Sequence, residues 1–330
     1  MNGTRQYLLS LGPARVVLTT VLPVEQAAGA MRSRGEPPLF GLAPVCDPVP
    51  GAARVLHVVT APGQAGTAWD GCTLTVRAPT GDLPGEGLLY LACLVLEAEL
   101  QRHGYLTLHA AAACRDGSAV LLLGPAGAGK TTSLLRLCRD HGAALAGNDL
   151  VVAGGTAAVP EVLAGNTYLR LRHASISQVL PELLSLFPGE VRDSWRAKLD
   201  VGPARLGIRA ATGPVPVAAV VFVHVDVRYP EVVDGPGDTL VHRLNLHENA
   251  LRYVRGTATP WLLGDGRFGP YVPALDDERA HAARVATLER LLARSRYVAG
   301  PPAAVAQHLS GLLAAGVPGL AAAGDMRRKP

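Results

Sequence analysis

Residues 124–131 read Gly-Pro-Ala-Gly-Ala-Gly-Lys-Thr, which is a complete GxxxxGK[ST] phosphate-binding motif. The glycines let the backbone turn its N–H groups toward phosphate oxygens, where side chains would block the approach. Lys130 would place a positive charge beside the β- and γ-phosphates of ATP, and the Thr131 hydroxyl would bind Mg²⁺. We therefore predict that nucleotide phosphates bind to Gly124, Pro125, Ala126, Gly127, Ala128, Gly129, Lys130, Thr131 and Thr132.

The segments on either side of the motif are those that such a loop requires. Ser118–Gly124 is an almost purely apolar run, which is typical of a strand buried in a sheet. Thr131–Asp140 carries leucines at helical spacing, so a helix is predicted to begin where the motif ends. The positive end of this helix dipole would then face the bound phosphates. The chain has only three lysines, Lys130, Lys198 and Lys329, and one of them stands in the motif.

An acid and a histidine lie close to the motif in the sequence. Asp149 follows Lys130 by 19 residues, on the strand predicted after the helix, and is a candidate for Mg²⁺ binding and for orienting a nucleophile. This short spacing differs from that of switch GTPases and transporter ATPases, in which a long insertion precedes the second acidic motif. His109 precedes Lys130 by 21 residues, on a strand predicted to pair with the strand that enters the loop.

Together these residues resemble the HPr kinase/phosphorylase family, whose core is shared with phosphoenolpyruvate carboxykinase. In that family a histidine precedes a GxSGxGK[ST] loop, and an Asp-Asp pair closes the strand after the loop's helix. The resemblance covers roughly residues 106–152 and implies an α/β P-loop kinase core that uses ATP and Mg²⁺. It implies that Lys130 and Thr131 hold phosphate and metal, that Asp149 lies on the metal side, and that His109 orients the acidic group.

Asn148 departs from the family pattern, because it occupies the position of the first acid, the usual catalytic base. An amide cannot accept a proton in that role. Three alternatives remain open from the sequence. Asp149 could serve both as base and as metal ligand, another acid such as Asp200 or Asp226 could enter the site, or the protein could bind nucleotide without transferring phosphate. The Glu-Arg-Gly stretch that the family uses to recognise HPr is also not evident, which disfavours HPr as substrate.

Three cations further along the chain are candidates for substrate binding. Arg170 and Arg172 alternate on a predicted strand and would therefore point to the same face, where guanidinium groups suit phosphate or carboxylate. Lys198 is one of the few lysines in an arginine-rich chain, which indicates a need for a compact charge.

The chain is predicted to comprise a β-rich N-terminal subdomain (1–104), a P-loop kinase core with C-terminal helices (105–317) and a flexible tail (318–330). In the first part we expect strands at 7–11, 15–20, 55–60 and 72–78, helices at 24–34 and 86–103, and a proline-rich loop at 37–51. In the second we expect strands at 106–114, 118–124, 144–153, 159–163, 168–171, 216–227 and 239–246, and helices at 131–140, 174–186, 248–254, 276–294 and 302–315.

Composition narrows the class of protein. The chain has 330 residues, of which 48% are hydrophobic, so it can bury a sizeable core. Its charge of +4 is mild, aromatic residues make up 5%, and no basic segment alternates with stacking residues, so a nucleic-acid partner is not expected. Five cysteines without a CxxC pattern indicate reduced thiols in a cytoplasmic protein, and no segment predicts a membrane span. A homo-oligomer is compatible with the sequence.

Three functions are consistent with these observations. The leading one is an ATP-dependent kinase that phosphorylates a hydroxyl of a small molecule or peptide, with the looser HPr-kinase-like group suggesting natural-product biosynthesis. The second is a non-catalytic ATP-binding partner that recognises a peptide or carrier, which Asn148 favours. The third is a small-metabolite kinase of the shikimate or adenylate type, for which residues 192–209 would supply the arginine-rich lid. The acceptor and the nucleotide base are not specified by any short motif.

Overall fold

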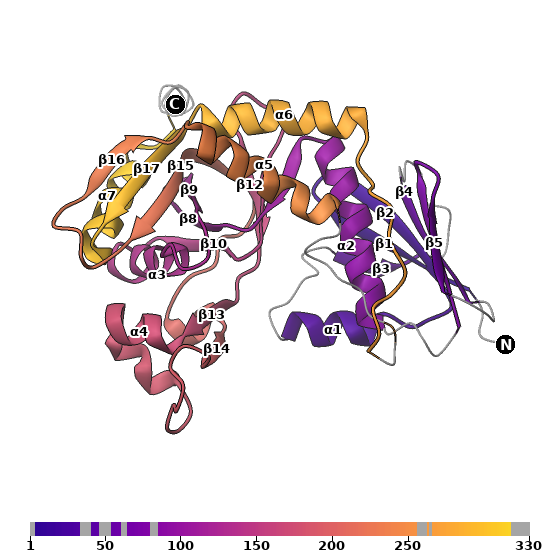
Figure 1. Cartoon of the computed structure of the whole chain (residues 1–330), viewed down its shortest axis with the longest axis horizontal. Helices are drawn as coiled ribbons and strands as arrows, with labels where there is room; N and C mark the ends of the chain where they lie inside the picture. The colour runs from indigo at the N-terminus through magenta and orange to yellow at the C-terminus, as the bar shows by residue number, and fades with distance from the viewer. Residues whose placement is uncertain are drawn as a thin grey trace, which may run out of the picture. The chain divides into compact units, whose positions relative to one another are not determined.

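The computed structural model describes residues 4–33, 41–45, 54–60, 65–79, 85–255, 263 and 266–317. It is a mixed α/β structure that divides into two compact units (Figure 1). The first unit comprises residues 1–107 and 247–287, and the second comprises 108–246 and 288–330. The predicted tail at 318–330 and most of the predicted loop at 37–51 lie outside the described residues.

This division differs from the continuous domains expected from the sequence. The first boundary lies close to residue 104, but residues 247–287 belong to the first unit and not to the kinase core predicted at 105–317. Buried polar contacts explain the difference. Gln101 donates to the carbonyl of Ala250 at 2.8 Å and accepts from Arg284 at 2.7 Å, and Thr287 donates to the carbonyl of Gly104 at 3.0 Å. Such long-range contacts leave no periodic signal in the sequence.

The first unit is built on a six-stranded sheet in the order β3-β1-β2-β4-β6-β5. β1 and β2 form an antiparallel hairpin, whereas β2, β4 and β6 are parallel neighbours. The strands are β1 (Arg5–Leu11), β2 (Ala14–Thr20), β3 (Gly41–Pro44), β4 (Arg54–Thr60), β5 (Gly66–Trp69) and β6 (Thr73–Ala78). Four of them match predicted strands, while β5 was not predicted and β3 lies within the segment predicted as a loop.

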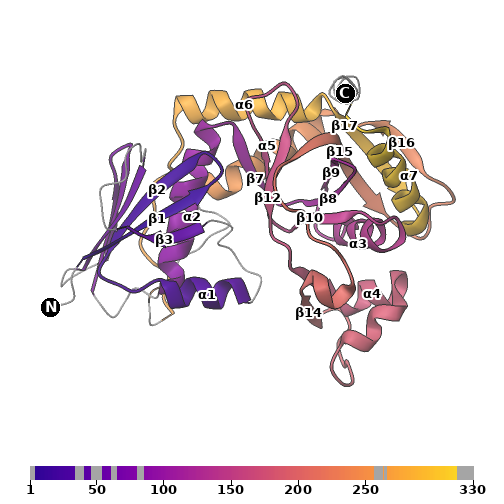
Figure 2. The ribbon, with the colours of Figure 1, turned by 180° about the vertical axis from the view of Figure 1, so that it is seen from behind.

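Two helices complete the N-terminal part of this unit, α1 (Glu25–Ser33) and α2 (Gly85–Arg102). α2 is almost entirely buried and packs against β2 and β4 (Figure 2). Both helices agree with the predicted segments to within a residue or two. The short strand β7 (Tyr105–Leu108) then carries the chain from the first unit into the second.

The central sheet of the second unit includes the order β10-β8-β9-β15-β12-β11. β9 and β17 both run parallel to β15, and β16 pairs with β17. The strands are β8 (Ala111–Arg115), β9 (Ser118–Leu123), β10 (Ala144–Asn148), β11 (Val151–Gly154), β12 (Glu161–Gly165), β15 (Val215–Val225), β16 (Val233–Pro236) and β17 (Ser295–Gly300).

β8 and β9 form the hairpin that delivers the chain to the glycine-rich loop. Arg115 lies opposite Ser118, so the turn has two residues, Asp116 and Gly117, with φ of 52° and 75°. Positive φ at both positions is the geometry for which Asp-Gly is selected. The strand that pairs with the loop strand is thus β8, which begins two residues after His109, so the prediction that His109 lies on this strand is wrong.

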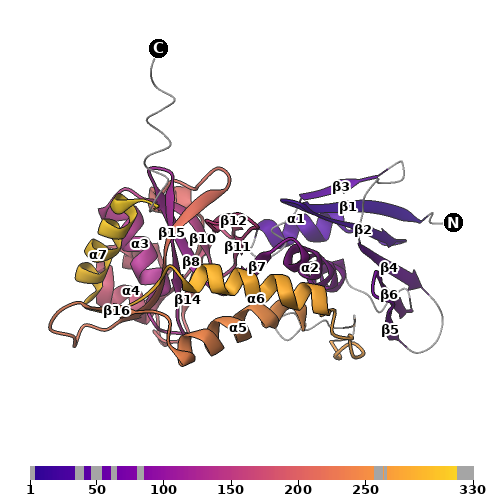
Figure 3. The ribbon, with the colours of Figure 1, turned by 90° about the horizontal axis from the view of Figure 1, so that it is seen from above.

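Helices α3 (Lys130–Asp140) and α7 (Pro302–Ala315) pack side by side and cover β8, β9 and β15 (Figure 3). The buried side chains of α3, among them Leu134 and Leu137, join the core beneath it. Cys138 belongs to the same core, and burial raises the pKa of its thiol to about 12. It therefore packs as a small apolar residue, as a thiol at such a pKa is a poor nucleophile.

A two-stranded sheet extends from the second unit, formed by β13 (Leu169–Arg172) and β14 (Lys198–Val201). Between these strands the chain forms α4 (His173–Val179) and a 3₁₀ helix (Pro181–Leu186), and another 3₁₀ helix (Pro203–Leu206) follows β14. A single helix was predicted at 174–186, but Pro181 cannot donate an N–H to the preceding turn and the α-helix ends before it.

Three predicted strands differ from the structure. Residues 239–246 were expected as a strand but begin the helix α5 (Leu240–Val254). The buried residues Leu246, Ala250 and Val254 recur every four positions, which is the helical period, whereas Leu240 is 72% exposed. The predicted strands at 106–114 and 144–153 are each interrupted, by His109 and by Asp149. The remaining helix is α6 (Glu278–Leu292).

In the part of the chain that the structure describes, no helix has the length and apolar character needed to cross a membrane. Cys72, Cys93, Cys114 and Cys138, the cysteines within the described residues, form no disulfide bond there.

Candidate active site

The glycine-rich loop connects the end of β9 to the start of α3, as the motif predicts. Gly124, Gly127 and Gly129 have φ of 142°, 85° and 91°, a region that residues with a side chain rarely adopt. The first helical N–H groups, those of residues 130–132, have no earlier turn to which they could donate. Because Lys130, Thr131 and Thr132 line a cavity, the positive end of α3 is directed at that cavity.

Gly129 is fixed by close packing as well as by its backbone angle. A Cβ atom at this position would lie 2.4 Å from Cβ of Val225, at the end of the neighbouring strand β15. The amide of Val225 also donates to the carbonyl of Ala128 at 2.9 Å. The loop is therefore held against the end of β15.

We expect Gly129→Ala to destabilise the protein and to disrupt the loop. Backbone strain costs about 1–3 kcal/mol, and overpacking against Val225 adds about 1–3 kcal/mol. Gly127→Ala is the matched control, because its φ is also positive but nothing lies within 4 Å of its added Cβ. Chemical denaturation of both variants measures the difference, and equal destabilisation would contradict the packing argument.

Lys130 is buried, with 7% of its surface exposed. Its Nζ donates to the carbonyl oxygens of Gly124 at 2.7 Å and Pro125 at 3.1 Å. Burial lowers the pKa of this ammonium, while the charge of Asp149 acts in the opposite direction. Both hydrogen-bond acceptors are uncharged carbonyls of the loop itself, and no carboxylate within the described residues forms a salt bridge with this ammonium, so its positive charge is held beside the loop.

Thr131 and Asn148 are joined by a hydrogen bond. The Thr131 hydroxyl donates to Oδ1 of Asn148 at 3.0 Å, and Nδ2 of Asn148 lies 3.4 Å from the carbonyl of Tyr168. Asn148 is 1% exposed and is the last residue of β10. Its side chain therefore orients the hydroxyl of the predicted metal ligand and leaves the oxygen lone pairs of Thr131 directed elsewhere.

Asp149 stands in the left-handed backbone region, with φ of 63°. Aspartate and asparagine tolerate this conformation better than most residues. Nδ1 of His109 hydrogen-bonds to the main-chain carbonyl of Asp149 at 3.1 Å, and because a carbonyl can only accept, this nitrogen carries the proton. His109 thus holds the backbone of Asp149, whereas the family resemblance led us to expect that it orients the acidic group.

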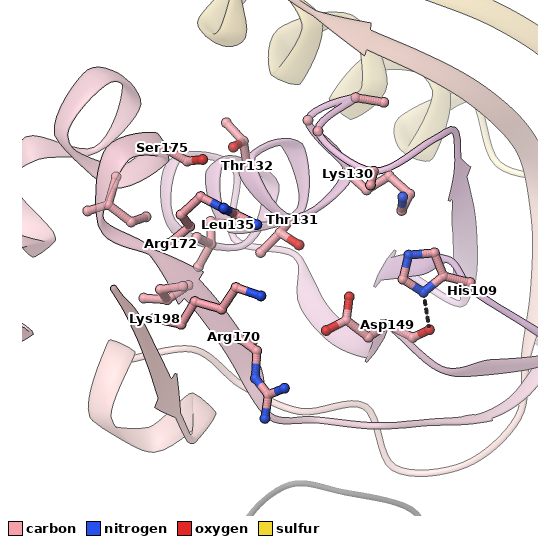
Figure 4. A pocket seen from close by; sticks show the side chains of 16 residues that line it. His109, Lys130, Thr131, Thr132, Leu135, Asp149, Arg170, Arg172, Ser175 and Lys198 are labelled. Atoms are coloured by element: carbon pink, nitrogen blue, oxygen red, sulfur yellow. Dashed lines mark hydrogen bonds between the residues drawn. The ribbon is translucent and has the colours of Figure 1, made fainter. Parts of the chain in front are cut away.

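The predicted residues gather around one cavity of about 370 Å³ within the second unit. In Figure 4 the side chains of Thr131, Asp149 and Lys198 extend toward the same central space. Gly124, Pro125 and Asn148, which were also predicted as site residues, do not line it. The lining residues are His109, Ala126, Gly127, Ala128, Gly129, Lys130, Thr131, Thr132, Leu135, Asp149, Arg170, Leu171, Arg172, Ser175, Ile176 and Lys198.

The sequence reasoning missed Leu135, Leu171, Ser175 and Ile176 as lining residues. Leu135 could have been found, because it lies one helical turn after Thr131. Ser175 and Ile176 are on α4, and no motif links that helix to the loop.

The two other acids considered as bases do not join this cavity. Asp200 accepts both guanidinium hydrogen bonds of Arg170, at 2.7 and 2.9 Å. Asp226 is paired in the same way with Arg228, which lowers the pKa of the carboxyl to about 2, and it lines a separate cavity of about 220 Å³. Asp149 is therefore the carboxylate that lines the cavity beside the loop.

Residues 192–209, considered as an arginine-rich lid, contribute one cation to the cavity. Lys198 lines it, whereas the arginines of this segment do not. This arrangement gives little support to a lid of the shikimate or adenylate kinase type.

No protein-family model matches this chain, and neither does any curated protein. A search of solved structures finds the HPr(Ser) kinase/phosphatase from Coxiella burnetii, with 20% sequence identity and a TM-score of 0.24. The match covers 37% of this chain and 66% of that protein, just under two thirds of its length.

Proposed function

We propose that this protein is an ATP-dependent kinase with the P-loop core of the HPr kinase and phosphoenolpyruvate carboxykinase type. It would bind ATP with Mg²⁺ at residues 124–132 and transfer the γ-phosphoryl group to a hydroxyl of a small molecule or peptide. The observation that carries this proposal is that Lys130 and Thr131, at the start of α3, line the same cavity as Asp149, which follows β10.

The residues at the loop fit a Mg²⁺-bound nucleotide. Gly127 and Gly129 line the cavity with positive φ, and no protein atom lies within 4 Å of the position that a Cβ atom of Gly127 would take, so the loop backbone is open to a phosphate there. Mg²⁺ in nucleotide sites is held by one or two protein oxygens together with phosphates and waters. The Thr131 hydroxyl and the Asp149 carboxylate supply oxygens of that kind, and ATP with its Mg²⁺ supplies a phosphoryl group whose charge is partly neutralised.

Each side chain then has a distinct task. Lys130 and the N–H groups at the start of α3 would offset the negative charge on the transferred phosphoryl group. Asp149 would orient the acceptor hydroxyl and take its proton, as the new bond from that oxygen to phosphorus forms and the bond to ADP breaks. Asn148 would hold Thr131, and His109 would hold the backbone of Asp149. The roles of base and metal ligand thus fall to Asp149, and Asn148 takes neither.

Thr131→Val tests the nucleotide site directly. The change removes the hydroxyl while keeping the volume, so ATP affinity measured by calorimetry should lose at least about tenfold with Mg²⁺ present and change little without it. Thr132→Val is the comparison, because Thr132 also lines the cavity but lies outside the hydrogen bond with Asn148. It should affect binding equally with and without Mg²⁺. Failure of the wild-type protein to bind ATP would refute the proposal.

A non-catalytic ATP-binding partner is the second candidate function, and Asn148 is the observation that favours it. The two functions differ in one measurement. Incubation with ATP, Mg²⁺ and candidate acceptors should yield stoichiometric phosphate on an acceptor if the protein is a kinase. ATP binding without transfer to the true acceptor would support the second function.

A further inference from the structure

Two cations lie directly opposite each other on the hairpin formed by β13 and β14. In the antiparallel register Arg172 pairs with Lys198, and Arg170 pairs with Asp200 two positions earlier, on the same face of the hairpin. Side chains at directly opposite positions stand on the same face of the sheet, and like charges there are destabilising. The pair of Arg172 and Lys198 therefore needs an explanation that the pair of Arg170 and Asp200 does not.

The partners of these side chains differ. Arg170 is neutralised by Asp200, to whose carboxylate it donates two hydrogen bonds. Arg172 donates to the uncharged carbonyl of Trp195 at 2.5 Å. Among the described residues, neither Arg172 nor Lys198 forms an ion pair with a carboxylate. Two positive charges thus stand side by side without a protein anion to compensate them.

The hairpin holds both cations in a fixed place. On its other face Leu169, Leu171 and Val201 are buried in the core of the second unit. Arg172 and Lys198 both line the cavity that contains Thr131 and Asp149. In Figure 4 Lys198 lies on the opposite side of Thr131 from Lys130, whereas Arg170 points away from the centre. The cavity that contains Asp149 thus has Lys130 on one wall and Arg172 and Lys198 on the opposite wall (Figure 4).

We propose that Arg172 and Lys198 form an anion subsite for the phosphate acceptor, which rests on the kinase function proposed above. The subsite would bind a carboxylate or phosphate group carried by the molecule whose hydroxyl is phosphorylated. A planar guanidinium beside a compact ammonium suits both of these anions. The loop, the start of α3 and Lys130 already supply the N–H groups and the positive charge that bind the nucleotide phosphates. Arg172 and Lys198, on the opposite wall of the cavity, are therefore assigned to the acceptor.

The test compares acceptors that differ only in charge. The probes are N-acetylserine and its neutral amide, and glycerol 3-phosphate and glycerol. Transfer from ATP to each probe is measured as kcat/KM, and binding of each probe is measured by calorimetry with a non-hydrolysable ATP analogue and Mg²⁺ present. ATP affinity is measured in parallel for every variant. The variants are Lys198→Gln and Arg172→Gln. Arg196→Gln is the matched control, because Arg196 lies in the segment that connects β13 to β14 and does not line the cavity.

We expect at least one anionic probe to be preferred over its neutral partner by about tenfold or more, in transfer or in binding. Lys198→Gln and Arg172→Gln should abolish most of this preference and leave ATP affinity unchanged, while Arg196→Gln should retain it. A preference for the carboxylate or for the phosphate identifies which anion the acceptor carries. Lys198→Gln should also melt at the same or a higher temperature, since it removes a like-charge pair.

Three results would overturn the inference. One is the absence of any preference for an anionic probe in the wild-type protein. Another is a loss of ATP affinity in Lys198→Gln or Arg172→Gln, because the cations would then serve the nucleotide. The third is equal loss of preference in Arg196→Gln. In each case normal ATP binding by the wild-type protein would still support the proposed nucleotide site. The proposal of the anion subsite can therefore fail without the proposal of the nucleotide site.

Discussion

Asp149→Asn should reduce phosphoryl transfer by about 10²- to 10⁴-fold while leaving the fold intact, because it removes the proposed base. At this position the substitution changes the carboxylate and leaves the local backbone as it is. Asparagine tolerates the φ of 63° that Asp149 adopts, and the main-chain carbonyl that His109 contacts is retained. Alanine would add backbone strain of about 1 kcal/mol or more and confuse the result. Single-turnover measurements of transfer at saturating ATP would quantify the loss.

Asp140→Asn is the matched control for this prediction. Asp140 ends α3 and forms an exposed ion pair with Arg136 at 2.9 Å, outside the cavity. Exposed pairs contribute about 0–1 kcal/mol, so this variant should keep full activity. If Asp149→Asn keeps wild-type activity, the proton must go elsewhere and the assignment of the base is wrong. If both variants lose activity, the effect is not specific to the carboxylate in the cavity.

The parts of the site that the sequence predicted are those specified by local chemistry. The positive φ values at Gly124 and Gly129 follow from a motif in which only glycine fits. The Asp116-Gly117 turn follows from the geometry of a two-residue hairpin. Both the strand before the loop and the helix after it were found because apolar residues recur at the period of each element.

The features that the sequence did not predict depend on contacts between residues that are distant in the chain. Arg170 and Arg172 are equivalent in the sequence, yet the register with β14 pairs one with Asp200 and the other with Lys198. A two-residue shift of the register would have placed Arg170, and not Arg172, opposite Lys198. His109 bonds to a main-chain carbonyl and not to a carboxylate, a difference that no motif encodes.

The functional hypothesis for Asn148 changed for the same reason. In the sequence it stands as a missing acid, which questions catalysis. In the structure it is buried against the Thr131 hydroxyl, and Asp149 occupies the cavity instead. The identity of a residue in a motif does not say which of two neighbouring side chains enters the site, because the backbone angle at Asp149 decides where each one points.

Lys130→Met should abolish detectable phosphoryl transfer, with a loss of roughly 10³-fold or more, because the change removes the positive charge nearest the loop. Lys130→Arg keeps the charge but should also be nearly inactive. A planar guanidinium is larger than an ammonium, and the lysine Nζ sits between two loop carbonyls at 2.7 and 3.1 Å. Transfer assays on both variants would separate the need for charge from the need for its position. Wild-type activity in Lys130→Met would reject the role assigned to Lys130, whereas wild-type activity in Lys130→Arg would show that a positive charge suffices without the position of the ammonium.

The stability of Lys130→Met should depart little from that of the wild-type protein, since two effects oppose each other. Loss of the donor leaves the carbonyls of Gly124 and Pro125 without their hydrogen bonds, at a cost of about 1–3 kcal/mol for each buried group. Against this, burial lowers the pKa of Lys130 in the folded protein below its ordinary value of 10.5, so the charged form is disfavoured by folding. The methionine removes that cost.

The pH dependence of stability distinguishes these two effects. Between the lowered pKa of Lys130 and 10.5 the unfolded chain binds more protons at this residue than the folded protein does. The Lys130 contribution to wild-type stability is therefore least favourable at neutral pH and improves as the pH rises through that window. Lys130→Met lacks the titrating group, so its melting temperature relative to wild type should fall as the pH is raised from 7 toward 10. A difference in melting temperature that stays constant over this range would show that the ammonium is not desolvated, and the lysine would then be held by its hydrogen bonds alone.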